Sequence, residues 1–296
     1  MADLKILAVL AVRNEEAYLQ VCLDYLVRQG IRVALIDNGS EDRTLEIARS
    51  YSRDDVVAID HLPFTGCFDL HAILTRKAEL ARWIGCDWVI HHDADEIMHT
   101  DRPGETLAEG IARVDQEGYE GIDFEEFVFL PEDESCSYAG TDYFRTMHAY
   151  YLFRPAGHHW MRAYRYRSGR TNAELGGHRV PLQEGQLYPG LFVKRHYLCL
   201  SLHGLRRKYV ARRWSPENIA KGWHYNRVGL TRDQLRLPPV SALKRWSVDP
   251  FALDRSDPKT THFWEWDAPK LTRPGSTPRS SSTGPGGSAG PTASPG

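Results

Sequence analysis

The stretch DWVIHHDADEIMH, residues 87–99, carries an apolar segment directly into a group of histidines and acids. Trp88 and Ile90 are bulky or β-branched, which favours a short buried strand. The acids that follow, Asp93 and Asp95 among them, would then lie at the carboxyl end of that strand. Ion pairs, solvated loops and metal sites can all have this composition, so the rest of the chain has to distinguish between them.

The first 130 residues alternate between short apolar segments and helical patterns. Strands are expected at residues 6–12, 33–36, 56–59, 88–90 and 122–129. Three helices are expected. The first runs to Gly30 and can be capped by Asn14, and the second runs to Tyr51 and can be capped by Ser40. The third covers residues 69–84 and ends before Gly85. This alternation predicts a parallel sheet covered on both faces. Ligands of such sheets bind outside the carboxyl ends of the strands, so the segments NEE (14–16), DNGSED (37–42) and DADE (93–96) should meet at one edge.

The composition excludes several classes of function. The chain has 296 residues, 42% of them hydrophobic, and a formal net charge of -2, which gives no overall reason to expect nucleic acid as a partner. Five widely spaced cysteines without a C-x-x-C pair indicate a reducing, cytoplasmic setting. No segment approaches about twenty uninterrupted apolar residues, so we expect no integral membrane segment and no processive, membrane-embedded synthase.

Two of the acidic segments have residue types suited to nucleotide chemistry. Asp37 and Asn38 follow a strand, where they can accept or donate hydrogen bonds to a base or a ribose, although a plain turn has the same sequence. Asp93 and Asp95 can converge on one divalent cation, and hard carboxylate oxygens suit Mg²⁺ or Mn²⁺. The alternative is a solvated strand end, because an isolated D-x-D is common.

Three segments together resemble the family 2 glycosyltransferases and their close relatives with the GT-A fold. They are AVRNEEAYLQVCLDYLVRQGI (11–31), VALIDNGSEDRTLEIA (33–48) and DWVIHHDADEIM (87–98), and the resemblance covers about residues 5–130. It implies an α/β, Rossmann-like, mostly parallel sheet flanked by helices, with a smaller C-terminal helical or irregular subdomain. We expect a nucleotide-sugar-binding half at 1–135, an acceptor-binding half and subdomain at 136–271, and a disordered Pro/Gly/Ser-rich tail at 272–296.

The resemblance also implies a nucleotide-sugar donor, most often a UDP-sugar, and a divalent metal, Mn²⁺ or Mg²⁺. Asp37 and Asn38 would contact the nucleotide, Asp93 would lie near the ribose, and Asp95 would ligate the metal on the diphosphate. Three further donor-binding residues would be Arg13, Asn14 and Glu15. Members typically act on a hexosyl group with inversion, using a carboxylate base.

The base and a further metal ligand are less clearly placed by sequence. The usual Glu-Asp pair is absent, and the segment GIDFEEFVFLPEDE (121–134) suggests Glu125 first and Glu126 second. Relatives often have a late histidine ligand, which points to His196 first and His203 second. The nearby basic residues of 195–213 could bind the diphosphate or an anionic acceptor, or form the solvated face of a helix.

Two alternatives to a metal-dependent, non-processive transferase remain. A degenerate transferase scaffold could bind a nucleotide or sugar without turnover, although Asp93 and Asp95 are both present. A nucleotidyltransferase would normally have a Gly-rich phosphate loop near the N-terminus, where this chain has acids. The acceptor is left open; a small molecule or a glycan fits the expected absence of a membrane segment.

Overall fold

The computed structural model describes residues 4–157, 159–167, 170–247 and 252–266. The chain divides into two units, Met1–Trp266 and Asp267–Gly296. The second unit lies outside the described residues, and so does the tail at 272–296 that we expect to be disordered.

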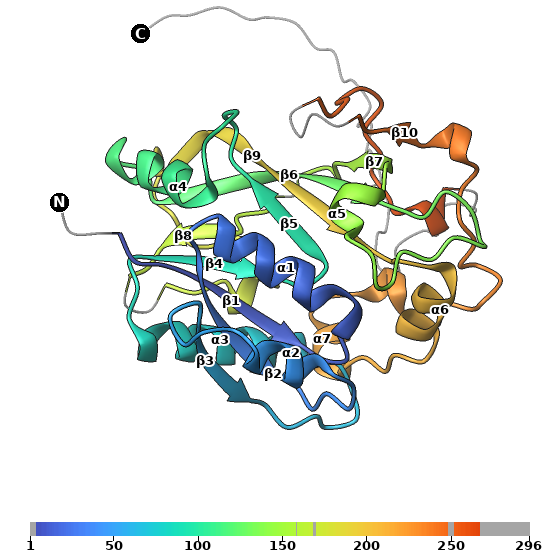
Figure 1. The fold of residues 1–296 in the computed structure, drawn as a ribbon, viewed down its shortest axis with the longest axis horizontal. Helices are drawn as coiled ribbons and strands as arrows, with labels where there is room; N and C mark the ends of the chain where they lie inside the picture. The colour runs from blue at the N-terminus through green and yellow to red at the C-terminus, as the bar shows by residue number, and fades with distance from the viewer. Residues whose placement is uncertain (1–3, 158, 168–169, 248–251, 267–296) are drawn as a thin grey trace, which may run out of the picture. The chain divides into compact units, whose positions relative to one another are not determined.

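The strands of the described residues form a mixed sheet (Figure 1). Their bounds are β1 Ile6–Val12, β2 Arg32–Asp37, β3 Val56–His61, β4 Trp88–His92, β5 Glu96–His99, β6 Gly121–Phe129, β7 Ala149–Phe153, β8 Ala163–Arg165, β9 Leu187–Tyr197 and β10 Lys244–Arg245. The order is β10-β7-β6-β8-β4-β1-β2-β3, with β9 paired to β6 and β5 paired to β9. β1 to β4 are mutually parallel, and β6 and β9 are also parallel. The predicted α/β class and its parallel N-terminal half are therefore confirmed.

Helices cover both faces of this sheet. Their bounds are α1 Glu16–Arg28, α2 Thr44–Arg49, α3 Leu70–Ile84, α4 Leu107–Gln116, α5 Tyr143–Thr146, α6 Leu202–Val210 and α7 Pro216–Ala220, with short 3-10 turns at Ala173–Leu175, Tyr225–Arg227, Val240–Ala242 and Phe263–Glu265. Alternate residues of β1 explain the two layers, since successive side chains of a strand point to opposite faces. Ala8 and Leu10 pack in the cluster that contains α1, whereas Leu7 and Val9 pack in the cluster that contains α3.

Two expectations about helix starts were wrong. Ser40 does not cap α2, which begins at Thr44, because the Ser40 hydroxyl accepts the backbone N–H of Asn14 instead. Asn14 does not cap α1 either: its φ is 56°, and its side chain accepts the N–H of Glu41. Both side chains join the turn after β1 to the turn after β2, so a tertiary contact replaces the local cap. For α3, the start and the stop at Gly85 are as predicted, with Asp69 as the cap.

A third cluster places α6 beside the second half of the sheet. Leu202, Leu205 and Tyr209 of α6 are buried together with Val128 of β6 and Tyr151 of β7.

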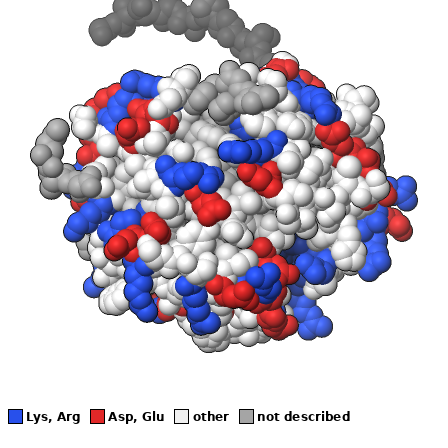
Figure 2. Space-filling model, in the orientation of Figure 1, with Lys and Arg blue, Asp and Glu red and all other residues white. Residues whose placement is uncertain are grey.

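None of the described helices is long and apolar enough to cross a bilayer. On the face shown in Figure 2, the Lys and Arg side chains are interspersed with Asp and Glu. Both signs of charge are therefore spread over this face.

Candidate functional site

The three acidic segments meet at the carboxyl ends of β1, β2 and β4. The backbone N–H of Asn14 donates to Ser40 Oγ over 3.1 Å, which joins the first segment to the second. Lys208 of α6 joins the first to the third, since its Nζ lies 4.0 Å from Glu15 Oε1 and 2.8 Å from Asp95 Oδ2. Parallel strands place their carboxyl ends at one edge, which is why segments eighty residues apart in sequence come together there.

Asp37 and Asn38 form the turn after β2. The carboxylate of Asp37 accepts the backbone N–H groups of Gly39 and Ser40 over 3.2 and 3.1 Å, and it lies 3.6 Å from His61 Nδ1. The Asn38 amide donates to Leu62 O over 2.9 Å. These contacts fix the turn, and a nucleotide contact by either residue stays a prediction.

Arg13 and Gly39 both lie against Phe64 beside that turn. The guanidinium of Arg13 lies 3.6 Å from the Phe64 ring centroid and 3.9 Å from Glu41. Gly39 has a φ of 73°, and a Cβ there would lie 3.2 Å from the Phe64 Cβ. The positive φ therefore favours glycine at this position, and a larger residue would also crowd Phe64.

Asp93 lies in the turn after β4 between two cations. Its Oδ1 is 3.3 Å from Lys77 Nζ and its Oδ2 is 3.3 Å from Arg162 Nη2, with His91 Nε2 3.9 Å away. Burial alone would raise the pKa of Asp93, but Lys77 and Arg162 hold that pKa well below its usual range. The carboxylate is charged and 40% exposed.

Asp95 has Lys208 on one side and His196 on the other. His196 Nε2 is 3.5 Å from Asp95 Oδ2, and its Nδ1 is 2.6 Å from Glu126 Oε1. Burial works to lower the pKa of His196, but the two carboxylates outweigh it and raise that pKa to about 10. The imidazole is therefore a cation held between two acids.

The ion pairs continue through Glu96 and Lys194, which are both 1% exposed. Arg162 Nη2 is 2.7 Å from Glu96 Oε1, and Lys194 Nζ is 3.0 Å from the same oxygen and 3.3 Å from Glu126 Oε2. Buried charges need such partners, because an unpaired one would cost several kcal/mol. Each of the four carboxylates, Asp93, Asp95, Glu96 and Glu126, thus faces cations supplied by the protein itself.

The side chains around Asp93 and Asp95 do not form a preassembled divalent-metal site. Within the described ranges, no group of three or more His, Cys, Asp or Glu side chains is placed to hold a metal ion. His196 faces Asp95 through Nε2 and Glu126 through Nδ1, and Lys208 already bonds Asp95 Oδ2. His203, the second candidate, is exposed on α6. The assignment of Asp93, Asp95 and His196 as metal ligands stays a prediction, and no chemical step below is routed through a metal.

The two candidate bases on β6 have different surroundings. Glu125 is paired with Arg154 and with Arg255, whose Nε is 2.6 Å from Glu125 Oε2. Glu126 points to the other face, where His196 connects it to Asp95. Burial would raise the pKa of Glu126, but Lys194 and His196 lower it. Only Glu126 is thereby joined to the acidic segments at the sheet edge.

Glu15 is a carboxylate of the site whose proton affinity is increased. Burial raises the pKa of Glu15 to about 7, and the Lys208 ammonium opposes that rise. Near neutral pH this side chain is therefore partly protonated, whereas Asp95 beside the same lysine is fully charged.

Sequence reasoning missed three cations of the site, Lys77, Arg162 and Lys194. Lys77 had a usable signal, because it falls on the inward stripe of α3 with Ile73, Leu74, Leu80 and Ala81. A lysine at such a position requires hydrogen-bond acceptors in the interior, here His92 O and Asp93 Oδ1. For Arg162 and Lys194, no local pattern identifies which carboxylate they would meet.

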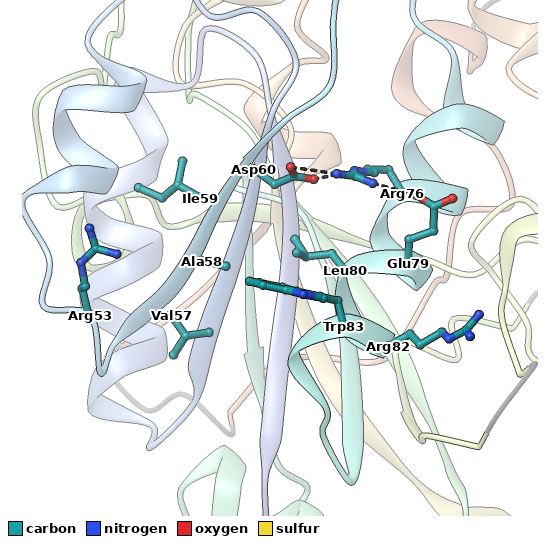
Figure 3. A pocket seen from close by; sticks show the side chains of 10 residues that line it. All are labelled: Arg53, Val57, Ala58, Ile59, Asp60, Arg76, Glu79, Leu80, Arg82 and Trp83. Carbon is teal, nitrogen blue, oxygen red and sulfur yellow. Dashed lines mark hydrogen bonds and ion pairs between the residues drawn. The ribbon is translucent and has the colours of Figure 1, made fainter.

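A separate hollow of about 750 Å³ lies between β3 and α3, away from these acids (Figure 3). Trp83, which is 78% exposed, and Leu80 form part of its wall. Arg76 reaches across to Asp60, donating to both carboxylate oxygens. None of the predicted site residues lines this hollow, so its volume does not bear on the chemistry at the sheet edge.

The mixed sheet with acidic turns at one edge is the arrangement expected for a GT-A-like transferase. The family model described as Glycosyl transferase family 2 matches residues 8–168, which is more than half of the chain. This protein belongs to glycosyltransferase family 2, and the predicted family and GT-A-like fold class are confirmed.

The comparison with solved structures finds distant similarities. Residues 1–349 of TarS from S. aureus are 12% identical, with a TM-score of 0.38, over 66% of this chain and 60% of that one. Glucosyl-3-phosphoglycerate synthase from Mycobacterium tuberculosis is 19% identical, with a TM-score of 0.29, over 43% of this chain and 45% of that one. The chain thus spans less than two thirds of each. No curated protein sequence matches it.

Proposed function

We propose that this protein transfers a hexosyl group from a nucleoside diphosphate sugar, a UDP-sugar in the first instance, to a hydroxyl of a small molecule or glycan. The observation that carries the proposal is the meeting of the three family segments at one sheet edge. Contacts of Asn14 with Ser40, and of Lys208 with Glu15 and Asp95, hold them together. Membership of family 2 supports a nucleotide-sugar donor at that edge.

In this proposal the nucleotide lies across the ends of β1 and β2. Asp37 and Asn38 face the base, and Arg13, Asn14 and Glu15 lie along the nucleotide. Asp93 contacts the ribose, because it is the most exposed carboxylate of the network and is held in place by Lys77 and Arg162. The diphosphate then lies near Asp95 and Lys208.

The transfer is proposed to be a single, inverting and non-processive displacement. A carboxylate takes the proton of the acceptor hydroxyl. The hydroxyl oxygen attacks the anomeric carbon at the same time, and the nucleoside diphosphate leaves. We assign this role to Glu126 ahead of Glu125, because Glu126 is joined through His196 to the donor-side acid Asp95. Glu125 is occupied by two arginines on the other face of β6.

A calorimetric titration tests the donor site. The purified chain is titrated with UDP, GDP, ADP, CDP and dTDP, each in buffer with Mn²⁺ and in buffer with EDTA. One nucleotide should bind in at least one of the two buffers. If none binds in either buffer, the donor site is wrong and the degenerate scaffold becomes the better interpretation. A variant with Asp133→Asn, an exposed-loop acid outside the site, is the matched control and should bind as the original chain does.

A further inference from the structure

Lys208 holds the central position of the candidate donor site. It lies on α6, and its Nζ is 2.8 Å from Asp95 Oδ2 and 4.0 Å from Glu15 Oε1. Its side chain is 19% exposed, so it is largely but not completely enclosed. The Tyr18 ring, with its centroid 5.7 Å away, packs beside it.

The position of Lys208 is set by a well-anchored helix. Ser201 caps α6 by accepting the backbone N–H of Gly204 over 3.1 Å, and Leu205 and Tyr209 are buried against the sheet. The neighbouring residue Arg207 points to solvent. Burial of Leu205 and Tyr209 fixes the rotation of α6 and brings Lys208 to Asp95.

Lys208 bonds Oδ2 of Asp95, one of the two carboxylate oxygens with which Asp95 could bind a metal ion. A divalent cation binds a carboxylate oxygen at roughly 2.0–2.6 Å, and an ammonium bonded to that oxygen would lie within a few ångströms of the ion and repel it. The remaining carboxylates do not favour a cation either, because Lys77, Arg162 and Lys194 already offset their charge. The site provides fixed cations where a metal site needs uncompensated acids.

We propose that Lys208 supplies the positive charge that binds the donor diphosphate, in place of a divalent metal. This inference rests on the proposed function. An ammonium has three N–H donors, of which Asp95 takes one, so the others can bind phosphate oxygens. Lysine is an established point-charge partner of phosphate. Asp95 then orients Lys208 and does not ligate a metal.

The test uses the nucleoside diphosphate that the titration above selects. The original chain should bind it with the same affinity in EDTA as in Mn²⁺. Lys208→Ala should weaken that binding at least tenfold in EDTA, and Lys208→Arg should recover part of the loss. Arg207→Ala, one position away on the same helix, should bind as the original chain does. The thermal unfolding midpoint of each variant shows whether it is folded.

The possible failures are distinguishable. Binding by the original chain that is lost in EDTA and restored by Mn²⁺ would overturn the role of Lys208 and keep the proposed function. Undiminished binding by folded Lys208→Ala in EDTA would also overturn it. If Lys208→Ala does not fold, the nucleotide affinity of the original chain in EDTA, compared with that in Mn²⁺, still decides whether the site needs a metal ion. Absence of nucleotide binding in every buffer would instead contradict the proposed function itself.

Discussion

Each carboxylate of the site is paired with cations, and these partners decide which carboxylate we assign as the catalytic base. Glu126 is 2% exposed and lies against Lys194 and His196, whereas Glu125 is paired with arginines that are about half exposed. Removing one partner of a buried pair typically costs about 3–5 kcal/mol, because the other charge is left without compensation. Substitutions here should therefore keep shape and polarity and change only the charge.

The assignment of the base is tested by two such substitutions on β6. Glu126→Gln should lower kcat by roughly 10²- to 10⁴-fold, the range for loss of a general base, while nucleotide affinity is retained. Glu125→Gln should leave kcat close to that of the original chain. The measurement is release of nucleoside diphosphate from the donor sugar, with circular dichroism as the check on folding. The opposite pattern would return the role to Glu125.

At the scale of elements, two helices start in different ways. α4 begins with a capping box in which Thr106 and Glu109 bond each other's backbone N–H groups. α3 is capped by Asp69, whose Oδ1 accepts the N–H of Ala72 and also an amide N–H of Asn218 in α7. The first cap is local, whereas the second also ties α7 to the start of α3.

This difference predicts unequal costs of removing the caps. Thr106→Ala should lower the free energy of unfolding by about 1 kcal/mol, the usual value for an N-cap. Asp69→Ala should cost about 1 kcal/mol more, because buried Asn218 also loses a hydrogen-bond partner. Urea unfolding of the two variants measures both values. Equal costs would show that the contact between Asp69 and Asn218 contributes nothing to stability.

For the molecule as a whole, buried histidines govern the response to acid. Burial lowers the pKa of His91, His92, His99 and His262, and it lowers the pKa of His224 to about 3. The unfolded chain takes up protons on these groups near pH 6.5, before the folded chain does. Stability should therefore fall as the pH drops from about 6.5 toward 3.

The urea midpoint of unfolding, measured from about pH 7 to about pH 4, tests this expectation. His99→Gln is the matched variant, because His99 is buried and bonded to Tyr25 and lies outside the acidic segments. Its midpoint should fall less steeply over this interval than that of the original chain. A midpoint that stays constant down to about pH 4 would contradict the prediction.

The sequence by itself determined the parallel half of the sheet and the edge at which the site lies. Short β-branched and aromatic segments form β1 to β4, and the acids after them must lie at the strand ends, because both features depend on neighbours in the chain. The start of α2 could not be predicted, since Ser40 bonds Asn14 across the site. The same limit applied to Glu125 and Glu126 on β6, because no local pattern indicates which cations they would meet.

Only the tertiary structure decided which cation meets which acid. Lys208 and Asp95 are 113 residues apart, and Lys194 and Glu96 are 98 apart. Their pairing follows from the register of β5 on β9 and from the packing of α6, which no local pattern contains. Charge neutralisation is set by distances of a few ångströms between such groups. The sequence could therefore place the acids, while the fold determined that lysine and arginine, and not uncompensated carboxylates, surround them.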